Sequence, residues 1–291
     1  VGNMDNEWPL QMGRYLWTDS GDNAHYFNGF IDNFDMWNTA LTQQEIQQYM
    51  TCPPNGDESG LVGYWNFEEG PGSTQVIDQT SNGNDGTING ATYDTNVPTQ
   101  SCNLTNVSGC DSTAILNLTI NSSNSSTTTV TACDSYTWND STYTQSGTYS
   151  YNEGLSNDYS MNLGTNCSQS GTTTSPNINF GDVLDMNSSF TVAAWYYASS
   201  TCVQHVTIAS KKEVNSGYQG WDIGYNNNDN KLRFSISQDY IGGGSPGNEY
   251  VETSNFIYDQ WTHIAAVFES NNKLSLYVNG QLEASSSTNF T

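Results

Sequence analysis

The chain has 291 residues, of which 30 are acidic and 6 are basic, giving a formal net charge of -24. This balance argues against nucleic acid as a partner, because binding to phosphate needs lysine and arginine. No stretch approaches the roughly 20 apolar residues of a membrane span, so no insertion into a membrane is expected. The abundance of Asn, Ser, Thr, Gly and Tyr favours an all-β protein built from many short strands.

The chain begins without an initiator Met or a signal peptide, so we expect it to be processed or to be a piece of something longer. Its six cysteines show neither CxxC nor zinc spacing, which favours disulfides in an oxidising compartment. We therefore expect a secreted protein that is extracellular or at the cell surface. The cysteines are Cys52, Cys102, Cys110, Cys133, Cys167 and Cys202.

The spacing of the cysteines leaves their pairing open. Pairing of neighbours along the chain would join Cys52 to Cys102, and would join the remaining four as Cys110–Cys133 and Cys167–Cys202. The bond between Cys52 and Cys102 is the most firmly expected, because it would close a loop around one self-contained segment.

Residues 26–50 predict a strand, a turn and a short helix. Alternation over residues 30–37 places four side chains on one face: Phe30, Asp32, Phe34 and Met36. Asp32 would then share its face with three large apolar side chains, where a carboxylate needs hydrogen-bond donors or a cation. Thr42 and Glu45 have the spacing of a capping box, which predicts that the helix begins there.

The run FNGFIDNFDMWNTALTQQEI resembles the closing strand and helix of a laminin-G-like (concanavalin A-like) jelly-roll domain. Residues 61–98 resemble the opening of the same domain, with strands at 61–67 and 87–93 around a loop at 78–86. From residue 157 onward, DYSMNLG, SSFTVAAWYYASS and DQWTHIAAVFE resemble its third and later strands. The resemblance implies an all-β fold: a concanavalin A-like antiparallel jelly-roll sandwich, accompanied by a small disulfide-containing β module.

The end of this domain precedes its beginning along the chain. Residues 1–52 are expected to be the C-terminal part of a sandwich, residues 53–98 its opening strands, and residues 153–291 its N-terminal and central part. Residues 1–52 would complete the sandwich of the same copy or of the next copy. Residues 99–152 are expected to be a small Ser/Thr/Asn-rich β module or a linker, and they resemble cysteine-containing modules of large Bacteroidota surface proteins.

A sandwich cut in its middle exposes unpaired strand edges. We therefore expect a repeating subunit of an extracellular filament or giant surface adhesin, in contact with copies of itself head to tail. The alternative to such repetition is a circular permutation within one closed domain. In the repeating arrangement, the junction between units would be formed by Val1, Gly2, Asn289, Phe290 and Thr291.

Two other function classes remain open. One is a carbohydrate-binding, lectin-like module with glycans as partners, and the other is an accessory domain of a secreted polysaccharide-degrading enzyme. The chain itself is not expected to be an enzyme. Glu68 and Glu69 are adjacent, so strand geometry would turn them to opposite faces, and His263 lies in an apolar alternation that predicts packing.

The loop at residues 78–86 has the composition of a calcium site. Calcium takes about six to eight oxygen ligands, often from Asp and Asn in Gly-rich loops. The resemblance implies a structural Ca2+ in this loop and implies that Asp32 contributes a ligand. The predicted ligands are Asp32, Asp78, Asn82, Asn84 and Asp85. The alternative is a loop held by Asx turns, with Asp32 bonded to backbone N–H groups.

Aromatic side chains on the surface would be able to stack against sugars. Trp195 and Trp261 lie in the most apolar alternations and are predicted to be in the core. The aromatic residues available for a sugar surface are Trp8, Trp17, Trp65, Trp221 and Tyr240.

Overall fold

The computed structural model of the chain describes residues 8–16, 24–100, 136–138, 141–143, 157–164, 176–186, 188–200, 206–212, 219–226, 230–238, 247–271 and 273–287. The chain divides into two units, one formed by Val1–Cys102 with Asn157–Thr291 and the other by Asn103–Ser156. In the second unit, β9 (Tyr136–Trp138) and β10 (Ser141–Tyr143) pair as an antiparallel hairpin. No helix among the described residues is long and apolar enough to cross a membrane.

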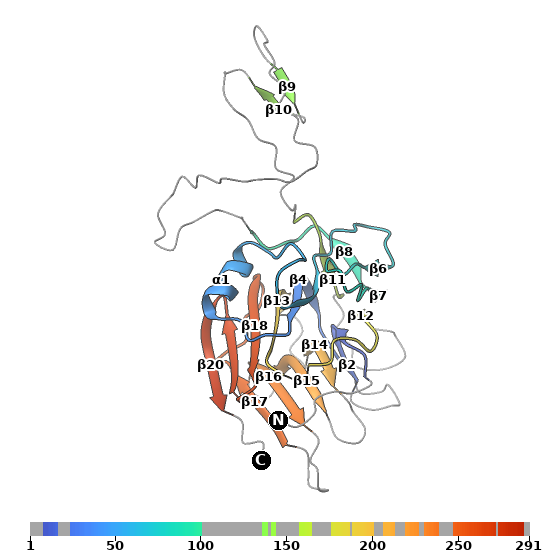
Figure 1. Cartoon of the computed structure of the whole chain (residues 1–291). Coiled ribbons are helices and arrows are strands. Elements are labelled where there is room, and N and C mark those ends of the chain that lie inside the picture. The colour runs from blue at the N-terminus through green and yellow to red at the C-terminus, as the bar shows by residue number, and fades with distance from the viewer. Residues whose placement is uncertain are drawn as a thin grey trace. The chain divides into compact units, whose positions relative to one another are not determined.

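The first unit contains two eight-stranded sheets, whose strands pair antiparallel (Figure 1). Sheet I has the order β17 (Gly247–Glu252), β16 (Lys231–Gln238), β15 (Gly220–Asn226), β14 (Val206–Lys212), β1 (Gln11–Met12), β12 (Asn177–Asn179), β7 (Gly86–Asn89) and β6 (Gln75–Val76). Sheet II has the order β20 (Gln281–Ser287), β19 (Lys273–Val278), β18 (Thr262–Glu269), β13 (Phe190–Ala198), β4 (Gly29–Trp37), β11 (Ser160–Asn162) and β8 (Thr92–Asp94), and β5 (Leu61–Trp65) also pairs with β4. A separate hairpin joins β2 (Arg14–Leu16) to β3 (Ala24–Tyr26).

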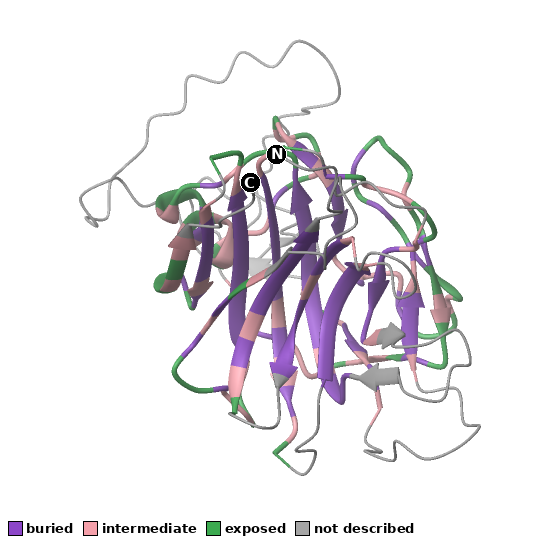
Figure 2. Cartoon of the chain, turned by 90° about the horizontal axis from the view of Figure 1, so that it is seen from below, coloured by how far each residue is buried: buried purple, intermediate pink, exposed green. Residues whose placement is uncertain are grey.

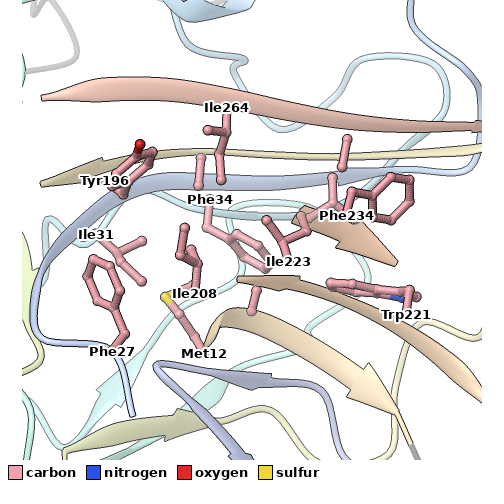
Figure 3. Packing of buried hydrophobic residues seen from close by; sticks show 14 of the residues in the cluster. Met12, Phe27, Ile31, Phe34, Tyr196, Ile208, Trp221, Ile223, Phe234 and Ile264 are labelled. Carbon is pink, nitrogen blue, oxygen red and sulfur yellow. The ribbon is translucent and has the colours of Figure 1, made fainter. Parts of the chain in front are cut away.

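The main core lies between the two sheets. Alternate residues of each strand point inward, because successive side chains of a strand face opposite sides. Figure 3 shows Phe34 and Ile264 of sheet II facing Ile208, Ile223 and Phe234 of sheet I. Each fully buried apolar side chain of this size stabilises the fold by about 1.5–3 kcal/mol relative to exposure. The long central strands are accordingly buried along most of their length (Figure 2).

The N-terminal segment completes the sandwich of its own chain. β1 lies between β12 and β14, and β4 lies between β13 on one side and both β11 and β5 on the other. Residues 1–52 therefore supply central strands to the sheets that later residues of the same chain form. The predicted junction residues Val1, Gly2, Asn289, Phe290 and Thr291 lie outside the described residues.

The predicted helix is α1 (Gln43–Thr51), and its capping box is confirmed. The Thr42 hydroxyl accepts from the Glu45 backbone N–H, and the Glu45 carboxylate accepts from the Thr42 backbone N–H at 2.8 Å. α1 covers part of the outer face of sheet II, where Ile46 joins a second apolar cluster that contains Trp37 (Figure 1). Gln47 fastens the helix to the β19–β20 turn by donating to the Gly280 carbonyl at 2.9 Å.

A bulge in β4 makes the predicted face assignment wrong. Asp32 pairs with Trp195 and Asp35 pairs with Ala193, so two β4 residues, Asn33 and Phe34, oppose one residue of β13. Asn33 has a φ of 47°, in the left-handed region that an asparagine tolerates better than most residues. Beyond the bulge the alternation changes phase. Phe34 and Met36 enter the main core with Ile31, whereas Phe30 and Asp32 face outward with Asp35 and Trp37.

One further strand differs from its prediction, and the last hairpin of sheet II is irregular. The single strand predicted at residues 87–93 is divided at Gly90, which has a φ of 75°, into β7 in sheet I and β8 in sheet II. In the β19–β20 hairpin, a register shift pairs Ala284 with Leu276 but Leu282 with Tyr277. Leu282 therefore does not share the inner face with Ala284, and it remains 46% exposed.

Candidate functional site

Three half-buried aromatic side chains form one row on the outer face of sheet II. Phe30 of β4 pairs with Tyr197 of β13, and Trp261 lies immediately before β18. The ring centroids are 5.8 Å apart for Phe30 and Tyr197, 6.0 Å for Tyr197 and Trp261, and 6.3 Å for Phe30 and Trp261. We call these three residues the aromatic row.

A polar row lies beside the aromatic row, two residues along each strand. Asp32 of β4 pairs with Trp195 of β13, and Trp195 pairs with His263 of β18. The Trp195 and His263 rings meet edge to face, with their centroids 5.3 Å apart. Asp32 is 0% exposed and His263 is 3% exposed. The two rows together place an apolar strip next to a buried polar strip.

Burial governs the charge of the polar row. Removal from water raises the pKa of the Asp32 carboxyl well above its usual value, and the nearby Glu68 carboxylate raises it further. The Asn157 amide and the Asn33 backbone N–H, which donates to Asp32 Oδ1 at 2.7 Å, act in the opposite direction. Burial also lowers the pKa of His263 to about 3. Both groups are therefore driven toward their uncharged forms.

Further polar side chains surround Asp32 beneath the outer surface. The Tyr64 hydroxyl donates to Asn33 Oδ1 at 2.6 Å, and the Asn33 amide donates to Gln100 Oε1 at 2.9 Å. The Trp37 indole N–H donates to Asp35 Oδ1 at 2.5 Å. Burial nevertheless raises the pKa of Asp35 to about 7, since one hydrogen bond does not replace the lost hydration.

Residues 96–100 lie over this part of sheet II. Asn96 Oδ1 accepts from the Trp261 indole N–H at 3.1 Å, so it fixes the orientation of one member of the aromatic row. At the other end of the segment, Gln100 accepts from Asn33 and donates to the Met50 carbonyl of α1 at 3.2 Å.

The loop predicted to bind calcium is held by hydrogen bonds within the protein. Asp78 Oδ1 accepts from the backbone N–H groups of Tyr64 and Thr80, at 3.1 and 2.9 Å, and its Oδ2 accepts from that of Asn84 at 2.9 Å. Asp85 accepts from the Asp78 N–H at 3.0 Å. The Asn82 and Asn84 amides both donate to the Val62 carbonyl, at 3.0 and 3.2 Å. These bonds match the Asx-turn alternative for the loop.

Of the predicted calcium ligands, the structure brings together Asp78, Asn82, Asn84 and Asp85, but no hydrogen bond within the described ranges joins Asp32 to any of them. The Asp78 oxygens already accept three N–H donors, and no group of three or more His, Cys, Asp or Glu side chains among the described residues is arranged to hold a metal. As arranged, the five residues do not form one shell of oxygen ligands. Calcium binding therefore stays a prediction that needs its own test.

Cys52, at the end of α1, is disulfide-bonded. The other five cysteines, one of which is its partner, lie outside the described part of the chain: Cys102, Cys110, Cys133, Cys167 and Cys202. The pairing of Cys52 with Cys102 stays a prediction, and peptide mapping without reduction decides it.

The expected division of the tryptophans between core and surface is wrong. Trp65 and Trp221 are 0% and 2% exposed in the main core, while Trp195 and Trp261 belong to the outer face of sheet II. The alternation around residue 195 does not reveal which phase faces the partner sheet, because both faces of β13 are largely covered. Trp8 is half-buried, and Trp17 and Tyr240 lie outside the described residues.

The described first unit is thus an antiparallel β-sandwich with one short helix, the architecture of a concanavalin A-like jelly roll. A family model described as the concanavalin A-like lectin/glucanases superfamily matches residues 167–291 of the chain. These residues include β12 to β20, and hence the β13 and β18 parts of both rows. No curated protein and no solved structure matches the chain. The fold and this partial family match together support, at most, a lectin-like or adhesive module.

Proposed function

We propose that this chain is a lectin-like adhesive module of an extracellular surface protein and that it binds carbohydrate on the outer face of sheet II. The observation that carries the proposal is the aromatic row of Phe30, Tyr197 and Trp261, half-buried and within 5.8–6.3 Å of one another. The rings are inclined to one another by 48–77°, so together they offer a compact apolar surface that is rigidly held and costs little conformational entropy on binding. The C–H faces of sugar rings match such a surface.

Binding without catalysis is part of the proposal, because the adjacent carboxylates already have structural partners. Glu68 accepts from the backbone N–H groups of Asp158 and Tyr159 at 2.9 and 3.0 Å. Glu69 accepts from the Ile77 N–H and from the Tyr93 hydroxyl, both at 3.0 Å. A glycosidase needs two carboxyl groups that are available on either side of one bond.

A place in a larger adhesin or filament is consistent with this module, but the support for sugar binding is more direct. Both sheets are built from one chain, so the sandwich needs no strand from a second copy. We therefore assign the adhesive role to a face of the domain and not to exchange of strands between copies.

The test is a glycan array followed by calorimetry on the best ligand. Replacing Tyr197 by Ala removes the ring that β13, the middle strand, contributes to the aromatic row, and should weaken binding about tenfold or more. The matched control is Tyr250→Ala on β17 of sheet I, where the tyrosine is 46% exposed and packs on Arg233. The control should bind like the unaltered protein. Binding that survives Tyr197→Ala, or an array without any glycan signal, contradicts the proposal.

A further inference from the structure

Each member of the polar row has a buried polar atom without a hydrogen-bond partner among the described residues. The atoms are Asp32 Oδ2, Trp195 Nε1 and His263 Nδ1. A side-chain hydrogen bond from Asn157 lowers the pKa of the Asp32 carboxyl, whereas Asp32 Oδ2 accepts no hydrogen bond from the part of the chain that the structure describes. Buried polar groups in folded proteins nearly always have partners, because a missing bond costs the full desolvation of the group.

The three atoms lie in register on one face of three neighbouring strands. Opposite residues of antiparallel strands have their Cβ atoms about 5 Å apart, so Trp195 is a direct neighbour of both Asp32 and His263. The indole N–H can only donate a hydrogen bond, whereas the carboxyl and the imidazole nitrogen can accept or donate, depending on their protons. A water or hydroxyl oxygen can both donate and accept hydrogen bonds, so it suits all three atoms.

We propose that the polar row binds hydroxyl oxygen atoms, each held between Trp195 Nε1 and either Asp32 Oδ2 or His263 Nδ1. The oxygen belongs to an ordered water in the free protein. Because the atoms of the polar row are buried, a hydroxyl group of a neutral sugar on the aromatic row takes the place of this water only when the side chains above the row move aside. The inference deepens the proposed function, and its sugar part rests on it.

Three features support a hydroxyl ligand over a charged one. Burial favours the uncharged forms of Asp32 and His263, which bind hydroxyl groups without the cost of burying an ion pair. Glu68 lies close enough to act on the Asp32 carboxyl, so an anionic sugar would meet like charge. The aromatic row begins two residues away on each strand, about 7 Å, which is within the span of one pyranose ring.

Efficient packing alone gives no reason for this row. In the neighbouring outer-face row nearer to α1, Asp35 of β4 lies opposite Ala193, and Ala193 lies opposite Ala265, which is 0% exposed in the apolar cluster beneath the helix. On β13 and β18, apolar residues therefore fit this face where the helix covers it, and the one carboxylate of that row has the Trp37 indole N–H as its partner. Polar side chains at the next position, in a covered environment, call for polar partners that the described protein atoms do not supply.

The first arm of the test is a crystal structure of the free protein at a resolution that shows ordered water. We expect an oxygen within about 2.7–3.2 Å of Trp195 Nε1 and of one of the other two atoms. A structure of the protein soaked with a methyl hexopyranoside shows whether a sugar hydroxyl replaces that water. Methyl glucuronide, which has the same ring with a carboxylate, is the matched ligand and should not bind.

The second arm measures affinity by calorimetry with the same methyl hexopyranoside. Trp195→Phe keeps an aromatic ring and removes only the N–H, and should weaken binding about five- to tenfold, the worth of one net hydrogen bond. Trp221→Phe is the matched control, since Trp221 Nε1 is also buried and without a partner among the described residues but lies in the main core. It should leave affinity unchanged. Asp32→Asn, which retains one carbonyl oxygen, is the second variant if Trp195→Phe does not fold.

The outcomes separate this inference from the proposed function. If the crystal structure of the ligand-free protein shows a water oxygen bound in the polar row, the inference is supported for water. This holds even if no sugar binds and the proposed function fails. A sugar hydroxyl in the row, together with the loss in Trp195→Phe, supports the sugar source. If Tyr197→Ala abolishes binding while no oxygen occupies the row and Trp195→Phe binds normally, the inference is overturned and the proposed function stands.

Discussion

At the scale of single residues, the outer face of sheet II is dominated by groups that burial holds away from their usual charge. The pKa of Asp35 is raised to about 7, which means that the folded protein holds this proton more tightly than the unfolded chain. The contribution of Asp35 to the free energy of unfolding is therefore complete below about pH 4 and is lost as the pH rises through 7. His263 behaves oppositely: its contribution is present above its usual pKa of 6.5 and is lost as the pH falls toward 3.

Replacing Asp35 by Asn should remove one part of this pH dependence. The amide keeps an oxygen that can accept from the Trp37 indole but has no proton to lose. Between pH 4 and 7, the unaltered protein should lose stability relative to Asp35→Asn, with a limiting slope of about 1.4 kcal/mol per pH unit. Urea unfolding at several pH values measures the difference.

Glu283→Gln provides the control for this experiment, because Glu283 is exposed on β20 and its replacement also turns one carboxylate into an amide. A constant difference in stability between Asp35→Asn and the unaltered protein across this range would show that Asp35 is ionised in both the folded and the unfolded states.

At the scale of the element, the loop at residues 78–86 shows one carboxylate organising a turn. Asp78 accepts three backbone N–H groups, from Tyr64, Thr80 and Asn84, and is itself 5% exposed. Because the Tyr64 N–H belongs to β5, the same carboxylate ties the loop to an edge of sheet II. Removing it leaves buried donors unpaired, and this costs more than the bond itself contributes.

We expect Asp78→Ala to lower the free energy of unfolding by about 2–4 kcal/mol, equally in calcium and in chelator. Asp57→Ala, in the turn that precedes β5, serves as the control because no hydrogen bond of its side chain is seen among the described residues. Denaturant titrations with added calcium and with chelator decide between the two explanations of the loop. If calcium raises the melting temperature of the unaltered protein and not that of Asp78→Ala, the loop binds the ion.

At the scale of the whole molecule, the position of β4 explains how one chain closes the sandwich. β4 pairs with β13, β11 and β5, so a strand from the first part of the chain lies in the centre of sheet II, between strands that come later in the sequence. β1 does the same in sheet I between β12 and β14. A chain that fills its own central positions leaves no half-built core for a second copy to complete.

The chain should therefore sediment as a monomer, with a single cooperative unfolding transition of the sandwich. Analytical ultracentrifugation over a hundredfold range of concentration measures this. Exchange of residues 1–52 between copies would instead give species that grow with concentration, because a head-to-tail contact of that kind does not close on itself. Such growth would restore the filament hypothesis for the isolated chain.

The sequence by itself determined the elements whose signals are local. The capping box needs only Thr42 and Glu45 on one turn, and the β19–β20 turn needs only Asn279 and Gly280, which both adopt positive φ. The alternation of Leu274, Leu276 and Val278 likewise marks a buried strand face. The concanavalin A-like fold followed from motifs of this kind, taken together along the chain.

The tertiary structure alone decided which side chains meet on the outer face of sheet II. The bulge at Asn33 depends on how β4 registers against β13, and a change of register by one residue turns every later side chain to the opposite face. In the folded protein Asp32 lies on the outer face of sheet II and not on the same face as Phe34 and Met36. Trp195 and Trp261, which the sequence pattern predicted to be in the core, also lie on the outer face. Asp32, Trp195 and His263 are far apart in sequence, and only pairing of three strands places them in one row. The local sequence pattern indicates where a strand lies and how its side chains alternate. Pairing with neighbouring strands decides which of its faces is buried.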